Sequence, residues 1–146
     1  MKFILTTVTL IGAAIAAVAP AAKPVGGPGT GTLTVFSGGT FKCANINSVI
    51  PTDGTAGDAV SASIVEDGCA IIDVTDQSLI TLTMTQAPKT GTLGCYVQLF
   101  TQQGCGFTLN NFFWGQPIPG TNVGTKLGCA QVPAGFGFGG ASMFCA

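Results

Sequence analysis

Apolar and polar residues alternate with a period of two in several short stretches of this chain. The strictest alternation is in "SLITLTMTQ" (78–86), which separates an apolar face from a face of threonines. The apolar positions there are Ile80, Leu82 and Met84. "TLTVF" (32–36) follows the same period, with Leu33 and Val35 on the apolar face. This pattern predicts strands that bury one face and expose the other.

The segment "CYVQLF" (95–100) also predicts a strand. Its period of two places Val97 and Leu99 on one face. Tyr96, Gln98 and Phe100 lie on the opposite face.

The segment "GDAVSASIVEDG" (57–68) is ambiguous between a helix and a strand. Asp58 could cap a short helix whose apolar face contains Val60, Ile64 and Val65. The same valines and isoleucine suit a strand, because β-branched side chains pack well on a pleated surface. We favour the strand.

Turn residues separate these stretches roughly every eight to twelve residues, a spacing typical of all-β folds. The 22 glycines also disfavour long helices. The sequence therefore predicts a mainly β fold, a small disulfide-stabilised antiparallel β-sandwich or barrel. One short helix, at 58–67, is left open.

The N-terminus has the layout of a secretory signal peptide at residues 1–19. Lys2 precedes an uncharged apolar run, and small residues follow. A retained membrane anchor is disfavoured because the run is short for a bilayer. We expect cleavage between residues 19 and 22, a flexible Gly/Pro leader at 20–31 and a single disulfide-rich β domain at 32–146. The mature protein is expected to be extracellular, without a membrane span, and monomeric.

Six cysteines lie in the predicted domain: Cys43, Cys69, Cys95, Cys105, Cys129 and Cys145. An even number behind a signal peptide predicts three disulfides, although six cysteines allow fifteen pairings. Each bridge over ten to thirty residues would stabilise the fold by roughly 3 kcal/mol, against a net stability of about 5–15 kcal/mol for a domain. We therefore expect reduction to unfold the protein.

Charge and residue types exclude several functions. The chain has five lysines, no arginine and no histidine. Sparse positive charge argues against nucleic-acid binding. Without histidine there is no Ser-His-Asp or Cys-His catalysis and no zinc site that uses imidazole. We expect neither a metal nor a cofactor, because no cysteine pair has metal-binding spacing either.

The acidic residues fall within one segment of 24 residues: Asp53, Asp58, Glu66, Asp67, Asp73 and Asp76. Two of them could form the carboxylate pair of a small glycoside hydrolase. "DGTAGD" (53–58) resembles part of a calcium loop, but the order of an EF-hand is absent. We favour the interpretation that the acids are solvated turn residues.

Three consecutive aromatic residues, Phe112, Phe113 and Trp114, could form a platform for a ligand or fill the core. We expect at least two of the three to be buried, because a glycine-rich interior needs their area. The candidate contact surface is the loop 115–124 together with whichever ring is exposed. Its candidate binding residues are Phe113, Trp114, Gln116 and Ile118.

At "GCYVQLFTQQGCG" and "ASMFCA" the chain resembles small secreted cysteine-rich proteins of filamentous fungi. The matching positions are Cys95, Val97, Leu99, Phe100, Cys105, Gly106, Ser142, Phe144 and Cys145. The resemblance covers the last fifty residues or so. It implies an effector, a virulence protein released outside the cell that acts by binding, and it transfers no functional residue.

The sequence therefore predicts a secreted, non-enzymatic, effector-like binding protein that recognises a host extracellular protein or a wall polysaccharide. Two alternatives stay open. One is an antimicrobial or killer-type toxin, and the other is the small carboxylate-dependent glycoside hydrolase.

Overall fold

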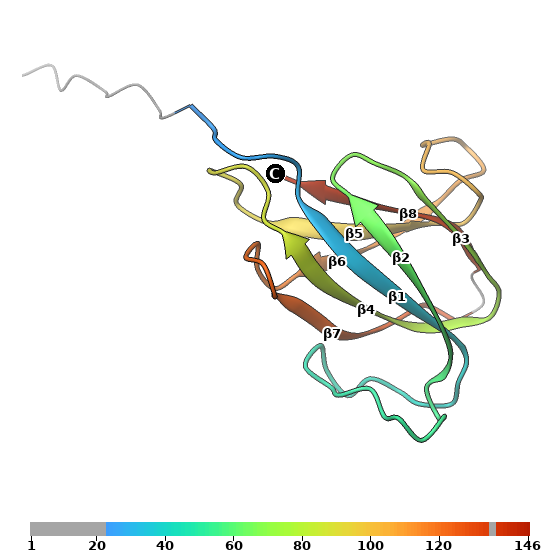
Figure 1. The fold of residues 1–146 in the computed structure, drawn as a ribbon. Coiled ribbons are helices and arrows are strands. Elements are labelled where there is room, and N and C mark those ends of the chain that lie inside the picture. Colours follow the sequence, from blue (N-terminus) through green and yellow to red (C-terminus); the bar gives the residue numbers. More distant parts are fainter. Residues whose placement is uncertain (1–22, 135–136) are drawn as a thin grey trace, which may run out of the picture.

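The computed structural model describes residues 23–134 and 137–146 (Figure 1). The expected signal peptide, 1–19, and its cleavage region, 19–22, lie outside the described residues. The described part of the chain contains strands and no helix. The strands are β1 (Thr30–Gly38), β2 (Gly57–Val65), β3 (Ala70–Val74), β4 (Gln77–Gln86), β5 (Cys95–Phe100), β6 (Phe113–Ile118), β7 (Lys126–Gln131) and β8 (Phe138–Cys145).

The strands form two antiparallel sheets that pack face to face. One sheet has the order β2-β1-β4-β7 and the other has the order β3-β8-β5-β6. Figure 1 shows the first sheet in front of the second. Buried side chains from both sheets, among them Leu33, Leu82, Val97 and Met143, make one core between them. The predicted mainly β, disulfide-stabilised fold is confirmed, and of sandwich and barrel it is the sandwich.

The predicted alternation matches the buried faces of β1 and β4. Leu33 and Val35 of β1 are buried, as are Ile80, Leu82 and Met84 of β4. Threonines cover the opposite face, where Thr34 lies opposite Thr81. The period of two in the sequence was sufficient to predict the buried faces of β1 and β4, because each of these strands has a neighbour on both sides and a core on one face only.

Segment 57–65 is a strand, so the ambiguity is resolved in favour of β2. Every residue of β2 pairs with β1, from Gly57 opposite Gly38 to Val65 opposite Thr30. Ile64 is buried, whereas Val60 and Val65 are exposed at the edge of the sheet. β1 itself begins at Thr30, two residues inside the segment expected to be a flexible leader.

The two faces predicted for β5 are confirmed, but the face of Phe100 is covered as well, and only 1% of Phe100 is exposed. Its ring does point away from the core between the sheets, but the connection 101–112 covers it, and the ring of Phe107 lies 5.5 Å from it. Both faces of β5 are therefore covered at this end.

All six cysteines form disulfides, as predicted. The pairs are Cys43–Cys129, Cys69–Cys105 and Cys95–Cys145. They close loops of 86, 36 and 50 residues, longer than the loops assumed from the sequence. Each is worth about 4 kcal/mol in the chain-entropy treatment. Three disulfides indicate a protein that resides in an oxidising environment.

The Cys43–Cys129 disulfide fixes the long connection 39–56 to β7. This connection extends beyond the lower end of the sheets in Figure 1. The Cys129 amide donates to the Ile46 carbonyl, and the Cys43 amide donates to Oε1 of Gln131. The described residues include no helix long and apolar enough to cross a membrane.

Candidate functional site

The outward face of β5 and β8 carries the residues that form the candidate site. Because alternate residues of a strand share a face, Tyr96 and Gln98 point away from the core that holds Val97. The register places Tyr96 opposite Phe144 and Gln98 opposite Ser142. Two neighbouring strands therefore supply one row of aromatic side chains and one row of polar side chains.

A groove with a volume of about 510 Å³ lies over these rows, and we call it the outer groove. Gln98 and Ser142 lie between its two aromatic ends. At one end the rings of Tyr96 and Phe144 are 5.3 Å apart, and at the other end stands Phe107, over Phe100. The two ends are four residues apart along β5, or about 13 Å at the rise of a strand.

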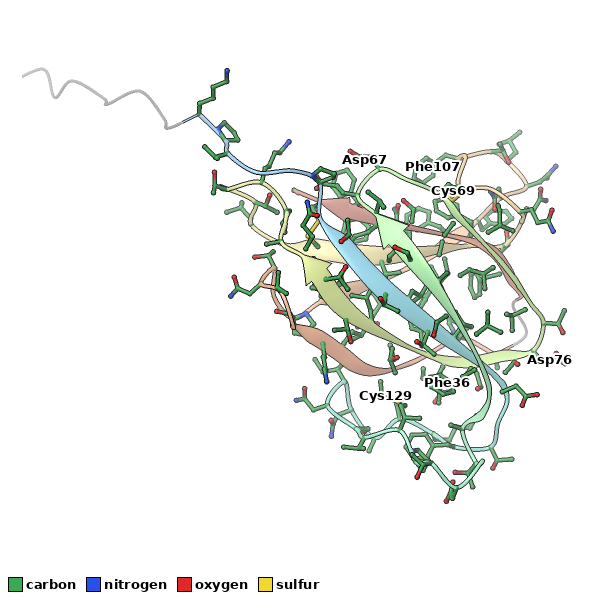
Figure 2. All side chains as sticks on the ribbon, in the orientation of Figure 1. Phe36, Asp67, Cys69, Asp76, Phe107 and Cys129 are labelled. Carbon is green, nitrogen blue, oxygen red and sulfur yellow. A yellow bond between two sulfur atoms is a disulfide. The ribbon has the colours of Figure 1, made fainter. Side chains whose placement is uncertain are left out.

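The turn between β2 and β3 forms one wall of the outer groove through Asp67, Gly68 and Cys69. Asp67 has a left-handed backbone, with φ of 59°, and its amide donates to the Met143 carbonyl of β8 at 2.9 Å. Aspartate tolerates this conformation better than most residues. Figure 2 shows Asp67, Cys69 and Phe107 gathered at one end of the molecule. The turn is thus attached to the strand that supplies the polar row.

The connection 101–112 forms the opposite wall and is folded around Asn111. Only 7% of Asn111 is exposed, although asparagine is polar. Its Oδ1 accepts from the Gln102 amide at 2.9 Å, and its Nδ2 donates to the carbonyls of Gly104 and Gly106 at 3.3 and 3.0 Å. The disulfide at Cys105 joins the same connection to the other wall. Phe107 therefore stands on a fixed segment.

Three phenylalanines at this end pack ring against ring, and we call them the aromatic cluster. Phe107 meets Phe113 at 5.4 Å and 83°, and Phe100 lies 6.0 Å from Phe113. Phe100 is the buried base, whereas 69% of Phe107 and 48% of Phe113 are exposed. Edge-to-face packing of this kind fixes ring orientation and adds about 0.5–1.5 kcal/mol per pair.

The expectation that two of Phe112, Phe113 and Trp114 are buried is wrong. Phe112 and Phe113 are both exposed, and Trp114 is half-buried against the core. The reason is that β6 is an edge strand of its sheet. No further strand covers its outward side chains.

The four candidate contact residues do not share a face. Phe113 points outward into the aromatic cluster, whereas Trp114, Gln116 and Ile118 alternate with it on the inward side of β6. Ile118 is only 6% exposed, which removes it from any contact surface. Residues 115–118 belong to β6, so the expected loop at 115–124 is wrong for its first four positions. A contact role for Phe113 stays a prediction.

Trp114 and Phe113 both line a second hollow, of about 420 Å³, at the beginning of β6. Its lining is almost wholly apolar and also includes Thr101, Phe112 and Phe138. This hollow offers shape but little hydrogen bonding. The outer groove combines both.

The acidic side chains that the structure describes lie in two groups rather than in one cleft. Asp58 is the second residue of β2 and Glu66 follows its last residue, so the two are about 26 Å apart at the rise of a strand. Asp76 belongs to the Asp58 end, because its carbonyl accepts from the Gly38 amide. Figure 2 shows Asp76 far from Asp67. Neither the outer groove nor the hollow beside Trp114 brings two carboxylates together.

Asp53 is a turn residue, as the sequence interpretation favoured. Its Oδ1 accepts hydrogen bonds from the Thr55 hydroxyl at 2.6 Å and from the Thr55 amide at 3.0 Å. These bonds stabilise the carboxylate and lower the pKa of Asp53. Within the described ranges, no cluster of three or more acidic or cysteine side chains has a geometry that could hold a metal ion.

Among the described residues, Asp67 is the one charged residue that lines the outer groove, and none of Lys23, Lys42, Lys89 and Lys126 lines it. The sequence missed most of this site. Tyr96, Gln98 and Phe100 were correctly assigned to one face, but nothing local indicated that Phe107 and Phe144 would enclose that face. Comparison of the chain with protein-family models, curated proteins and solved structures gives no match. The interpretation of the groove therefore depends on its own residues.

Proposed function

We propose that this is a secreted, non-enzymatic, effector-like binding protein whose contact surface is the outer groove with its aromatic cluster. The partner classes predicted from the sequence are a host extracellular protein and a wall polysaccharide. The observation that carries the proposal is the exposure of two packed rings, Phe107 on a connection fixed by a disulfide and by Asn111, and Phe113 on β6.

Exposed rings beside a concave surface favour recognition of a partner. A soluble protein rarely leaves large apolar side chains together in water unless they contact something else. Aromatic residues are also enriched among the few side chains that supply most binding energy. Because Phe107 is already held in place, little conformational entropy would be lost on binding.

A binding role is favoured over a hydrolytic one by the placement of the acids. Glycoside hydrolysis requires two carboxyl groups within about 5–10 Å on either side of the scissile bond. Among the residues that the structure describes, Asp67 supplies the one carboxyl group that lines the outer groove. The chain also lacks histidine, the commonest general base.

Release from the cell is supported by two independent features. The N-terminal sequence has the layout of a signal peptide, and three disulfides require an oxidising environment to form. A binding protein of this kind would meet its partner outside the cell.

The test uses the oxidised protein recovered from the medium of an expressing culture. Wild type, Phe113→Ala, Phe107→Ala and the control Thr83→Ala are incubated with plant and fungal wall material and with immobilised extracellular proteins. Thr83 lies on the outer face of the other sheet. We expect wild type and Thr83→Ala to be retained and both phenylalanine variants, with their fold verified by circular dichroism, to be released. Equal retention of all four, or of none, would contradict the proposed function.

A further inference from the structure

We infer that the outer groove binds a segment of an uncharged glycan chain. This inference rests on the proposed function and names the chemical class of its partner. It is drawn from four properties of the groove: polar side chains without a protein partner, the absence of cations, aromatic rings at both ends, and a position on a face rather than an edge of the sheet.

Two nearly buried polar side chains in the groove have no hydrogen-bond partner within the described part of the chain. Gln98 is 6% exposed and Ser142 is 7% exposed, and both line the groove. Every fully sealed side-chain nitrogen or oxygen in the described residues has a partner. The polar atoms of Gln98 and Ser142 therefore reach the surface of the groove itself. Side chains this buried are normally hydrogen-bonded, and a ligand would satisfy them.

The chemistry of these two groups matches hydroxyl groups. The Gln98 amide offers two donors and one acceptor, and the Ser142 hydroxyl both donates and accepts. A sugar hydroxyl likewise both donates and accepts. The matching set of donors and acceptors favours a ligand rich in hydroxyls over one that only accepts, such as a phosphate.

The charge of the groove favours a neutral ligand. Asp67 is its only charged lining residue among those described, and Lys23, Lys42, Lys89 and Lys126 all lie elsewhere. A polysaccharide rich in carboxylates would meet repulsion from Asp67 and no compensating cation. We therefore expect discrimination against acidic glycans.

The aromatic rings indicate the length of the ligand. Tyr96 with Phe144 stands at one end and Phe107 at the other, about 13 Å away along the strand. Rings present flat apolar faces that can cover the apolar faces of sugar rings, as they cover other flat ligands. This span exceeds a single sugar ring, so the groove suits an oligosaccharide rather than a monosaccharide.

An extended peptide would have better sites elsewhere on this molecule. Peptides commonly add to a sheet edge, where unpaired backbone groups bind them. Gln98 and Ser142 lie on β5 and β8, the two inner strands of their sheet, whose backbone groups already pair with neighbours on both sides. Recognition over Gln98 and Ser142 must therefore use side chains, as the groove does.

The outer face of the other sheet provides an internal comparison. It is also rich in hydroxyls, but there Thr34 bonds to Ser61 at 2.8 Å and Thr30 bonds to Thr85 at 2.7 Å. Four of its hydroxyls thus satisfy one another, and none of the aromatic pairs found in the described part of the chain encloses them. Thr83 on that face is a matched position for a control substitution.

The experiment is a titration of the oxidised protein with hexasaccharides as probes, monitored by calorimetry. The neutral probes are β-1,4-linked glucose, xylose, mannose and N-acetylglucosamine and β-1,3-linked glucose, and the acidic probe is oligogalacturonate. We expect one or more neutral probes to bind and the acidic probe not to bind. We expect Gln98→Leu to weaken binding about tenfold, Ser142→Ala several-fold and Phe107→Ala at least tenfold, with Thr83→Ala unchanged.

The outcomes separate this inference from the proposed function. If no neutral probe binds, or if the acidic probe binds best, the inference is wrong. It is also wrong if Ser142→Ala and Phe107→Ala, both folded, bind the neutral probe as wild type does. If no glycan probe binds, but wild type is retained on an extracellular protein and Phe107→Ala is not, the proposed function stands and the inference is wrong. If neither is retained through the groove, both are wrong.

Discussion

Phe107 and Phe113 meet edge to face, 5.4 Å apart, although the two residues belong to different segments of the chain. Phe113 belongs to an edge strand, and Phe107 belongs to the connection that precedes it. Their contact depends on the Cys69–Cys105 disulfide, which joins the connection to the turn between β2 and β3, and on Asn111, whose side chain bonds Gln102, Gly104 and Gly106 within the connection. The exposed aromatic surface is thus built by long-range constraints.

Phe107→Ala should abolish retention on the partner while it lowers the free energy of unfolding only slightly. Phe107 is mostly exposed, and its main contacts within the protein are the rings of Phe100 and Phe113. Losing two ring pairs should lower the free energy of unfolding by only about 1–2 kcal/mol. Urea denaturation measures this change, and retention on the partner measures recognition. A variant that fails to fold would show that Phe107 is a structural residue.

Asn111→Ala should destabilise the fold by about 3 kcal/mol. The substitution removes four hydrogen bonds, so the Gln102 amide, the Thr101 hydroxyl and two glycine carbonyls lose their partner. Asn110→Ala is the matched control, since Asn110 is exposed and its side chain makes no hydrogen bond with the described residues. It should change stability by less than about 0.5 kcal/mol. Equal effects of the two variants in thermal unfolding would disprove the role of Asn111.

Gly57→Ala should be far more destabilising than Gly54→Ala. Both glycines have left-handed backbones, with φ of 89° and 87°. A Cβ at Gly57 would collide with the backbone of Ser37 and Gly39, whereas a Cβ at Gly54 would enter open space. We expect a loss of about 1 kcal/mol at Gly54 and more than about 3 kcal/mol at Gly57. Chemical denaturation of the two variants compares them directly, and similar losses would contradict the close approach.

Removal of the Cys69–Cys105 disulfide should loosen the walls of the outer groove at temperatures where the core between the sheets stays folded. This bridge joins the two walls of the outer groove and closes a loop of 36 residues. The Cys69→Ser/Cys105→Ser double variant should lose about 4 kcal/mol and, at temperatures where it stays folded, should show rapid hydrogen exchange across 101–112. The Cys43→Ser/Cys129→Ser variant serves as the control. Rapid exchange across 101–112 in that variant as well would show that the groove does not depend on its own disulfide.

The sequence predicted what depends on local periodicity. The inward faces of β1 and β4 follow from the alternation at Leu33, Val35 and Leu82, because a half-buried strand needs only its own pattern. The burial of Phe100 was missed because the segment that covers it is held by a disulfide whose pairing the sequence leaves open. The exposure of Phe113 was missed because it depends on β6 being at an edge, a property of strand order.

The site itself was predicted only in part. Assigning Tyr96 and Gln98 to one face was correct, yet a groove also needs their partners Phe144 and Ser142 of β8, 48 and 44 positions away, in register beside them. Register between distant strands is a tertiary property. Among the candidate contact residues, Phe113 alone projects on the outer side of the sheet that carries the groove.

The most direct test of the outer groove is a nuclear magnetic resonance titration of the oxidised, isotope-labelled protein with the neutral hexasaccharides. We predict shifts of the Gln98 side-chain amide and of the backbone amides of Ser142 and Phe107, with those of Thr81 and Thr83 unmoved. Shifts confined to the threonine face, or the absence of any shift with every neutral probe, would contradict it.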